Sequence, residues 1–431
     1  MTTLPDLASA SDVTDEVGNA PSAKWVRLFC SVAFLFFLGA LNHVFGSEDE
    51  AGAGPLKALF LPIALLIQLI AIALLVSPSH LHKTLDALRR NRILLLALGV
   101  ILMSTFWSND PELTLRRALA LVGTTAVGIL IYIDAGDILK FFGVNLALFV
   151  VGSVFVALAF PALGTHTEGI HVGSWRGLLG FKNQAAWVTV LFLIVWIGMR
   201  KRAGLRAVTY PLLAVAFLLL FNTRSATGFA AFAAGIAALC GLSFYRQAHA
   251  VRPLLLVAFG IFALLIAADF DALYTQGLET LGRDDSLTGR TLLWTALQPL
   301  IESRPWFGNG YLAFWDHASD YFGDSSWMGE LVHAHNAYID ILLDVGVVGL
   351  ITQLSFLLGI CWKLLSKAAR GDSIATTMLA VYVTLGVIGI AGEVFFRPNS
   401  GIWIMVVAFA CYATNEKAPP FSAGSAKPVS T

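Results

Sequence analysis

Two histidines and an asparagine stand directly before an apolar stretch in the segment HAHNAYIDILLDVGVVGL, residues 333–350. A neutral imidazole can act as a general base, because its unperturbed pKa is about 6.5. A helix that included His335 would place it on one face with Tyr338 and Leu342. His333 and His335 are two residues apart, whereas a zinc pair on a helix has a spacing of four, so a metal site is not expected. The alternative is a polar helix cap without a chemical role.

Positively charged residues in the same half of the chain could bind an anion. Arg176 and Lys182 stand in HVGSWRGLLGFKNQAAW, Arg224 in NTRSATG and Arg290 in SLTGRTLLW. The planar fork of arginine suits phosphate oxygens. We therefore expect an anionic ligand, with ordinary ion pairing as the alternative for any single residue. Other cations of this kind are Arg116, Arg117, Arg283, Arg304 and Arg397, the last with Glu393 as a possible ion-pair partner.

The long segment 271–334 combines an expected helix with many aromatic residues. Ser286 or Thr288 could cap a helix that ends at Ser303, because Arg304 precedes a proline. The apolar stripe of this helix consists of Leu293, Leu297, Leu300 and Ile301. We expect it to lie flat on a membrane surface. The aromatic residues that follow could stack on sugar rings or anchor the loop at the interface, and both interpretations stay open.

Membrane-spanning helices must hold these segments in place. The chain is 57% hydrophobic and only 13% charged, with a mean hydropathy of +0.75. A span needs about 20 apolar residues, and about twelve stretches approach this requirement. They lie near residues 25–45, 56–77, 93–107, 118–133, 138–160, 185–199, 207–221, 227–244, 253–270, 345–365, 376–391 and 401–414.

The distribution of basic residues sets the expected orientation. Basic clusters near residues 83–92, 200–206, 246–252 and 363–370 alternate with loops that carry few basic residues, among them the acidic loop GSEDEAGAG. The positive-inside rule places these clusters in the cytoplasm. The expected domains are a disordered cytoplasmic tail at 1–24, spans one to nine at 25–270, a large outer loop at 271–344, spans ten to twelve at 345–415, and a disordered cytoplasmic tail at 416–431.

Composition also argues against two other kinds of site. Lysine and arginine together number 28 and so do aspartate and glutamate, so no bulk basic surface predicts nucleic-acid binding. The four cysteines lie in apolar stretches without a CxxC pair, which is typical of buried hydrophobic residues rather than of a disulfide framework or zinc site.

Several loose motifs follow one another along residues 170–350. They are G-x-W-R-G with K-N (Gly173, Trp175, Arg176, Gly177, Lys182, Asn183), G-R-x-x-x-W (Gly289, Arg290, Trp294), P-x-x-G-x-G (Pro305, Gly308, Gly310), and an H-N pair before G-x-x-G (His335, Asn336, Gly346, Gly349). Their order resembles the O-antigen ligase/polymerase superfamily of bacterial inner-membrane proteins. The first motif, with SLTGR, looks most like the ExoQ-type exopolysaccharide polymerases. The predicted topology extends the resemblance to nearly the whole chain.

The resemblance implies an all-α polytopic fold with a GT-C-like glycosyltransferase architecture and one large periplasmic loop. It implies transfer of a glycan from undecaprenyl diphosphate to a sugar hydroxyl at the periplasmic face, without a cofactor or metal. His335 would be the general base, Asn336 would orient it or the sugar, and Arg290 would serve both catalysis and binding. The residues implied to bind the diphosphate are Arg176, Lys182, Arg224 and Arg290. The implied partners are the lipid-linked oligosaccharide, the bilayer and a chain-length-regulating membrane protein.

Alternative functions remain at this point. A polymerase uses a second lipid-linked repeat unit as acceptor, whereas a ligase of the same superfamily uses lipid A core. A lipid-linked oligosaccharide transporter would need ionisable residues near the bilayer midplane. Here the unexplained charges collect at the expected outer face, which favours surface catalysis over transport. A non-catalytic scaffold would make His335 and the outer arginines dispensable.

Overall fold

The computed structural model describes residues 21–45, 56–200, 206–247, 285–323, 328 and 331–416. Within them the regular structure is helical, apart from an isolated antiparallel bridge between Thr165 and Trp175. This agrees with the predicted all-α class. The expected span at 253–270, the segment 271–284 and nearly all of both tails lie outside the described residues, and so do the side chains proposed to cap the next helix.

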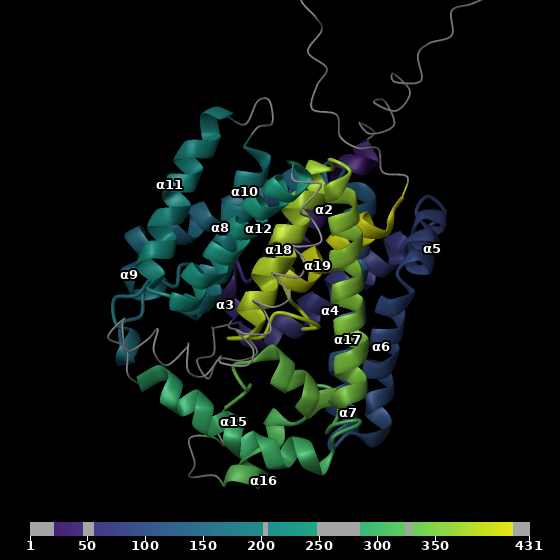
Figure 1. Ribbon diagram of the computed structural model, residues 1–431, viewed down its shortest axis with the longest axis vertical. Helices are drawn as coiled ribbons and strands as arrows, with labels where there is room; N and C mark the ends of the chain where they lie inside the picture. Colours follow the sequence, from purple (N-terminus) through teal and green to yellow (C-terminus); the bar gives the residue numbers. More distant parts are fainter. Residues whose placement is uncertain are drawn as a thin grey trace, which may run out of the picture.

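The helices form a bundle whose lower end in Figure 1 is crossed by α15 and α16. Their bounds are α2 Pro21–Phe37, α3 Asn42–Phe45, α4 Lys57–Leu75, α5 Leu81–Arg90, α6 Arg92–Met103, α7 Pro111–Asp134, α8 Ile138–Ala159, α9 Pro161–Gly164, α10 Lys182–Met199, α11 Arg206–Thr223, α12 Ala226–Gln247, α15 Asp285–Ser303, α16 Ala318–Phe322, α17 Ala337–Ala369, α18 Ser373–Gly389 and α19 Gly401–Thr414. Short 3-10 turns cover Ser104–Trp107, Gly169–His171 and Trp315–His317.

Several of these helices are suited to cross a membrane. Among the described residues, five are long and apolar enough: α4, α7, α8, α10 and α17. The bent pair formed by α5 and the helix that continues α6 to Trp107, with 85° between its halves, would be a sixth. Shorter apolar stretches occur at Ala207–Thr223, Ala226–Leu242, Ser373–Gly389 and Gly401–Thr414. These helices fit a membrane protein, while the number twelve stays a prediction.

Two expected boundaries change in the structure. The stretch predicted as one span at 25–45 ends its first helix at Phe37, and Gly39 adopts a left-handed φ of 90° that turns the chain. The helix expected at 118–133 begins earlier, at Pro111, because Asp110 accepts a hydrogen bond from the Leu113 N–H (3.0 Å) as its N-cap. Arg117 therefore belongs to the second turn of α7.

Small residues allow the central helices to pack closely. A Cβ on Gly198 of α10 would lie 2.2 Å from the Thr377 Oγ1 of α18. A Cβ on Gly235 of α12 would lie 2.4 Å from the Thr384 Oγ1 of the same helix. Such contacts are typical of helices that associate within a bilayer, where small side chains let backbones approach. They place α18 at the centre of the bundle.

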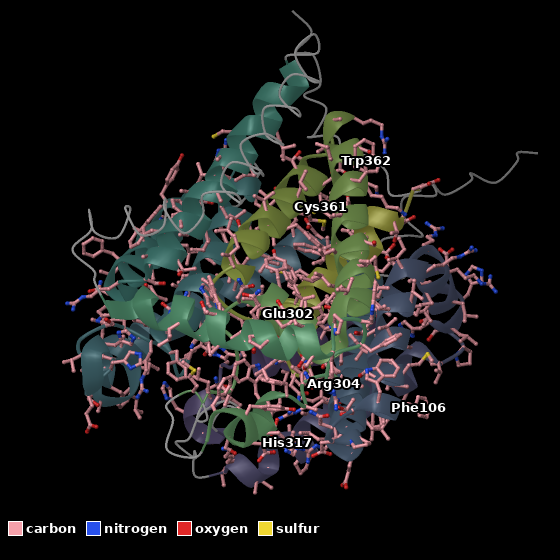
Figure 2. All side chains as sticks on the ribbon, turned by 60° about the horizontal axis from the view of Figure 1, so that its bottom comes forward. Phe106, Glu302, Arg304, His317, Cys361 and Trp362 are labelled. Carbon is pink, nitrogen blue, oxygen red and sulfur yellow. The ribbon has the colours of Figure 1, made fainter. Side chains whose placement is uncertain are left out.

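Helix α15 ends at Ser303, as predicted from the Arg304-Pro305 sequence. Leu293 and Leu297 are fully buried, in a small core that also contains Phe314 and Trp315 of the following loop. Part of the predicted apolar stripe therefore covers the protein itself rather than a membrane surface. Figure 2 turns this end of the molecule forward, with Glu302, Arg304 and His317 on it.

Candidate functional site

A cavity with a volume of about 590 Å³ lies among the described residues. Its polar lining includes two histidines and two arginines, and its apolar lining includes several aromatic side chains. The polar lining is His333, His335, Arg117, Asp316, Glu393, Arg397, Asn42, Gln184, Asn399 and Ser400, and the aromatic lining is Phe36, Phe37, Phe60, Phe181, Trp187 and Trp315. Five regions distant in the sequence meet here, so the cavity exists only in the folded protein.

The helix that follows the two histidines begins after them. The Asn336 side chain is the N-cap of α17 and accepts hydrogen bonds from the backbone N–H groups of Tyr338 (3.0 Å) and Ile339 (3.3 Å). His335 lies outside the helix with a φ of 54°. The expectation that it shares a helical face with Tyr338 and Leu342 is therefore wrong. The helix begins only after its N-cap, Asn336, so His335 precedes the helix.

The two imidazoles form a compact pair. The His335 backbone N–H donates to the His333 Nδ1 (3.1 Å), and the ring centroids are 4.1 Å apart with an interplanar angle of 84°. A non-glycine residue with a left-handed φ costs free energy and commonly occurs at functional sites. The strained turn at His335 brings both rings to the wall of one cavity.

Ala334, between the histidines, is held on both sides. Its N–H donates to the Asp340 carboxylate (2.9 Å), which also accepts from the Trp315 indole (2.8 Å). Its C=O accepts from the Trp294 indole (2.9 Å). Trp294 comes from the G-R-x-x-x-W motif, so that motif supports the histidine segment from α15. These hydrogen bonds fix the backbone between the two histidines, so the positions of the imidazoles do not depend on contacts of the imidazoles themselves.

Burial keeps both imidazoles neutral. It lowers the pKa of His335 to about 3, and the nearby His333 and Arg290 lower it further, against the opposite effect of Asp340. Burial, Arg397 and Arg290 likewise lower the pKa of His333 to about 3. At neutral pH each ring is therefore uncharged, and its one unprotonated nitrogen can accept a hydrogen bond or a proton; in His333 this nitrogen, Nδ1, already accepts the His335 N–H.

These pKa values predict that acid destabilises the fold. Burial, followed by Arg176, His171 and Lys182, also lowers the pKa of His166 to about 4. Below pH 6.5 an unfolded histidine binds a proton that the folded protein excludes, so stability is lost as pH falls toward these folded values. We expect the thermal midpoint in detergent to fall between pH 7 and about 4.5, and to fall less in a His166→Gln, His333→Gln double variant. The control is His82→Gln, at an exposed position; an equal acid sensitivity of the double variant and the wild type would contradict this prediction.

The P-x-x-G-x-G motif at Pro305–Gly310 packs against the G-x-x-G motif that begins at Gly346 of α17. Gly346 has φ 64° and ψ −164°, which breaks α17 into two helical parts. The turn at Pro305–Gly310 supplies the hydrogen bonds that the break removes: the Gly310 N–H donates to the Asp344 C=O (2.8 Å), and the Val347 N–H donates to the Pro305 C=O (2.8 Å). The first part of α17 thus forms a rigid support beneath the histidine segment.

The four cations predicted to bind an anion fall into two groups. Arg290 lies close enough to both histidines to lower their pKa. Arg176 stands on the loop before α10, Lys182 is the first residue of α10, and Arg224 lies between α11 and α12. The Arg176 Nε donates to the Leu163 C=O (2.9 Å) and the Lys182 Nζ to the Arg224 C=O (3.5 Å). None of the four belongs to the described residues that line the cavity, although the neighbouring Phe181 does.

Arg117 and Arg397 line the cavity instead. Arg117 pairs with Asp316, and Arg397 forms the ion pair with Glu393 that the sequence suggested as an alternative. The sequence analysis includes both among the cations of the expected outer face, but it does not predict either of them as a diphosphate-binding residue. The available signal was a position in or beside an expected outer loop, but the sequence alone cannot show which of these segments line the same cavity.

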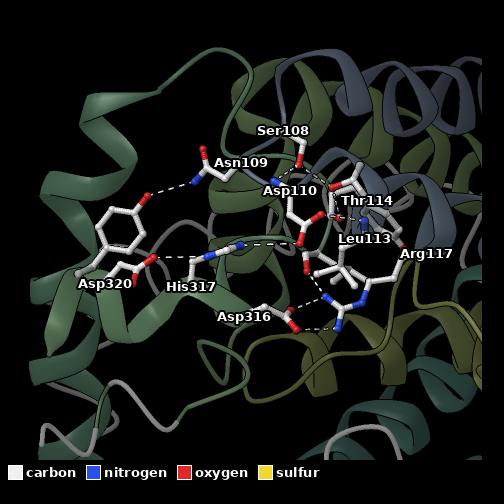
Figure 3. A network of polar contacts seen from close by, with 12 residues as sticks. Ser108, Asn109, Asp110, Leu113, Thr114, Arg117, Asp316, His317 and Asp320 are labelled. Atoms are coloured by element: carbon white, nitrogen blue, oxygen red, sulfur yellow. Dashed lines mark hydrogen bonds and ion pairs between the residues drawn. The ribbon is translucent and has the colours of Figure 1, made fainter. Parts of the chain in front are cut away.

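A polar network ties the loop after α15 to the start of α7 (Figure 3). His317 lies between Asp110 (3.9 Å) and Asp320 (3.4 Å), and Arg117 pairs with Asp316. These contacts hold the loop that carries Trp315 over the cavity. Across the described ranges, no group of three His, Cys, Asp or Glu side chains is arranged to hold a metal ion.

Comparison with known proteins supports the resemblance seen in the motifs. A family model described as O-Antigen ligase matches residues 211–354, which include Arg290 and His335. The chain is 28% identical over 279 residues to the exopolysaccharide production protein ExoQ of Rhizobium meliloti (strain 1021). That alignment covers 58% of this chain and 59% of the length of the relative. With the apolar helices described above, these findings confirm the predicted resemblance and a membrane location.

Proposed function

We propose that this chain is an O-antigen ligase-like membrane protein that acts as a polysaccharide polymerase of exopolysaccharide biosynthesis. It transfers a glycan from undecaprenyl diphosphate to a hydroxyl of another lipid-linked repeat unit, at the periplasmic face of a bacterial inner membrane. The observation that carries this proposal is the cavity, whose lining combines neutral imidazoles, arginines and aromatic side chains. The likeness to ExoQ favours a polymer-forming reaction over other activities of this enzyme class.

In the proposed mechanism His335 is the general base. An acceptor hydroxyl attacks the anomeric carbon, the new glycosidic bond forms, and the bond from that carbon to the diphosphate oxygen breaks. The hydroxyl proton passes to an imidazole nitrogen of His335, and undecaprenyl diphosphate leaves. The negative charge of a bound diphosphate would raise the pKa of His335 from its value of about 3, so that donor binding strengthens the base when it is needed.

Cations stabilise the charge that grows on the leaving diphosphate. Arg290 is next to the histidines, while Arg176, Lys182 and Arg224 form the second group, near the N-termini of α10 and α12. We propose that both groups contact the donor as it enters, with its polyprenyl chain among the spanning helices. For Asn336, the Oδ1 atom already caps α17, so a direct role would have to use its amide N–H groups.

The proposed topology has residues 271–344 as the periplasmic segment and both termini in the cytoplasm. The resemblance also implies a chain-length-regulating partner in the membrane. A ligase that transfers glycan to lipid A core is the second candidate, because the matching family model is itself described as O-Antigen ligase. Both candidates use the same donor and differ only in the acceptor.

Deletion of the gene separates these candidates. We expect long secreted polysaccharide to disappear, single lipid-linked repeat units to remain, and lipopolysaccharide to keep its normal banding. The measurements are size-exclusion profiles of secreted glycan and gels of lipopolysaccharide from the same strain, with the complemented strain as control. Loss of chains from lipid A core, with accumulation of long lipid-linked glycan, would establish the ligase instead. Accumulation of repeat units on the cytoplasmic side would indicate transport.

A further inference from the structure

The loop between α18 and α19 forms one wall of the cavity, from Glu393 to Ser400. Two of its residues have left-handed backbones although neither is glycine: Phe396 with φ 52° and Asn399 with φ 55°. Each such residue costs free energy, so the surrounding structure must hold it in place. Arg397 lies between these two positions in the sequence, and it is one of the residues that line the cavity.

Several contacts from distant helices hold the loop. The Tyr311 hydroxyl donates to the Phe396 C=O. The Asn399 N–H donates to the Thr124 Oγ1 (3.0 Å), and its side-chain oxygen accepts from the Gln68 amide (2.8 Å). These bonds reach the loop from α4, α7 and the segment after α15, so three parts of the fold determine where Arg397 lies.

The Phe396 side chain adds an apolar anchor. It is fully buried, and its ring centroid is 4.3 Å from that of Trp403 on α19. Phe396 and Arg397 are adjacent, so the buried ring fixes the backbone from which the Arg397 side chain extends. The arrangement keeps a long, flexible side chain in one place before any ligand arrives, which lowers the entropic cost of binding.

The charged partners of Arg397 are both carboxylates. Its side chain is 19% exposed; it pairs with Glu393 on the same loop, and its guanidinium lies 3.9 Å from the Asp340 carboxylate. Asp340 is fixed in place, since its Oδ1 accepts from Trp315 and from the Ala334 N–H. Its Oδ2, which lies near Arg397, accepts no hydrogen bond from the described residues, and Asp340 is not among the residues that line this cavity. Glu393 also lines the cavity, where an entering anion would meet it. Glu393 is therefore the partner that an anion can replace.

We propose that Arg397 is a phosphate-binding residue of this cavity, and that Glu393 occupies its guanidinium until the diphosphate of the lipid-linked substrate displaces the carboxylate. This inference rests on the proposed function, because it takes the lipid-linked diphosphate as the ligand. It adds a preformed cation on the α18–α19 loop to Arg290 of α15, since both arginines lie close enough to His333 to lower its pKa. The planar guanidinium of Arg397 would donate two hydrogen bonds to the phosphate, close to His333 and His335, which line the same cavity.

The test measures binding of farnesyl diphosphate to the full chain in nanodiscs. Arg397→Gln is expected to weaken binding by roughly 10- to 100-fold, because charge-assisted hydrogen bonds are lost. Arg397→Lys keeps the charge without the fork and should give an intermediate loss. Glu393→Gln is expected to tighten binding, because the competing carboxylate charge is removed. The matched control is Arg304→Gln, since Arg304 bonds to Asn109 and is not a lining residue of the cavity.

The opposite effects of the two substitutions distinguish a binding role from a structural ion pair. Wild-type binding in Arg397→Gln, equal weakening in both variants, or no binding to the wild type would overturn the inference. If Arg397→Gln fails to fold, Arg397→Lys and Glu393→Gln decide. Chain extension of a lipid-linked repeat unit is measured on the same wild-type sample: extension with unchanged Arg397→Gln binding refutes the inference alone, and Arg397-dependent binding without extension refutes the proposed function alone.

Discussion

Replacement of His335 with alanine is expected to reduce glycan transfer by roughly 10²- to 10⁴-fold, the usual contribution of a positioned general base. The side chain lines the cavity, and its ring is neutral because burial lowers its pKa to about 3. No similar base replaces it directly, since the His333 Nδ1 already accepts the His335 N–H. Transfer is measured with purified protein in nanodiscs and a lipid-linked repeat unit, as polymer formed per unit of protein.

The control for this substitution is His317→Ala. His317 lies at the same end of the molecule but pairs with Asp110 and Asp320 outside the cavity lining. It should retain most of the transfer activity. Both variants should keep the thermal midpoint and membrane level of a folded protein. Near-normal polymer from a folded His335→Ala variant would remove this residue from the mechanism and favour a scaffold role.

Gly346→Ala is expected to have the largest effect on folding, lowering the free energy of unfolding by roughly 3 kcal/mol or more. Gly346 needs a left-handed φ of 64°, and a Cβ there would lie 2.4 Å from the carbonyl carbon of Trp306. Because the obstacle is backbone, no side-chain rotation can relieve it. The Pro305–Gly310 turn would have to separate from α17, which breaks the hydrogen bonds at Asp344 and Val347.

Thermal unfolding in detergent measures this effect, with Gly99→Ala as the matched control. Gly99 lies within α6 and a Cβ there would meet no atom within 4 Å. Replacing a helical glycine in open space with alanine should raise the free energy of unfolding by about 0.5–1 kcal/mol. We expect Gly346→Ala to lower the thermal midpoint and the transfer activity together, because the same break supports the histidine segment. An unchanged midpoint would show that the turn is not needed for stability.

Local patterns predicted much of the fold. Hydropathy identified α4, α8 and α10 within a few residues, since an apolar run long enough to span a bilayer is a property of the run itself. The Arg304-Pro305 sequence predicted the end of α15 for a similarly local reason. The early end of α2 was missed, because the turn at Gly39 packs against Leu179, far away in the sequence.

The candidate site was predicted only in part. His335 was identified from the order of the motifs, and the structure places it on the cavity wall. The catalytic base and the diphosphate-binding roles themselves stay predictions. The cations on that wall are Arg117 and Arg397, whereas Arg176, Lys182 and Arg224 belong to another cluster. The sequence shows which cations lie in or beside loops, but it does not show which of them line the same cavity.

The sequence by itself determined the class of this protein: a helical membrane chain with a neutral net charge, a family resemblance, and a histidine pair before an apolar helix. Only the tertiary structure decided which groups surround that pair. Asp340, Trp294 and Trp315 hold Ala334, and Arg397 arrives from a loop about sixty residues further along the chain. Hydrophobic period and turn chemistry act over a few residues, whereas a cavity is made by packing between helices whose separation in the sequence carries no information about their distance in space.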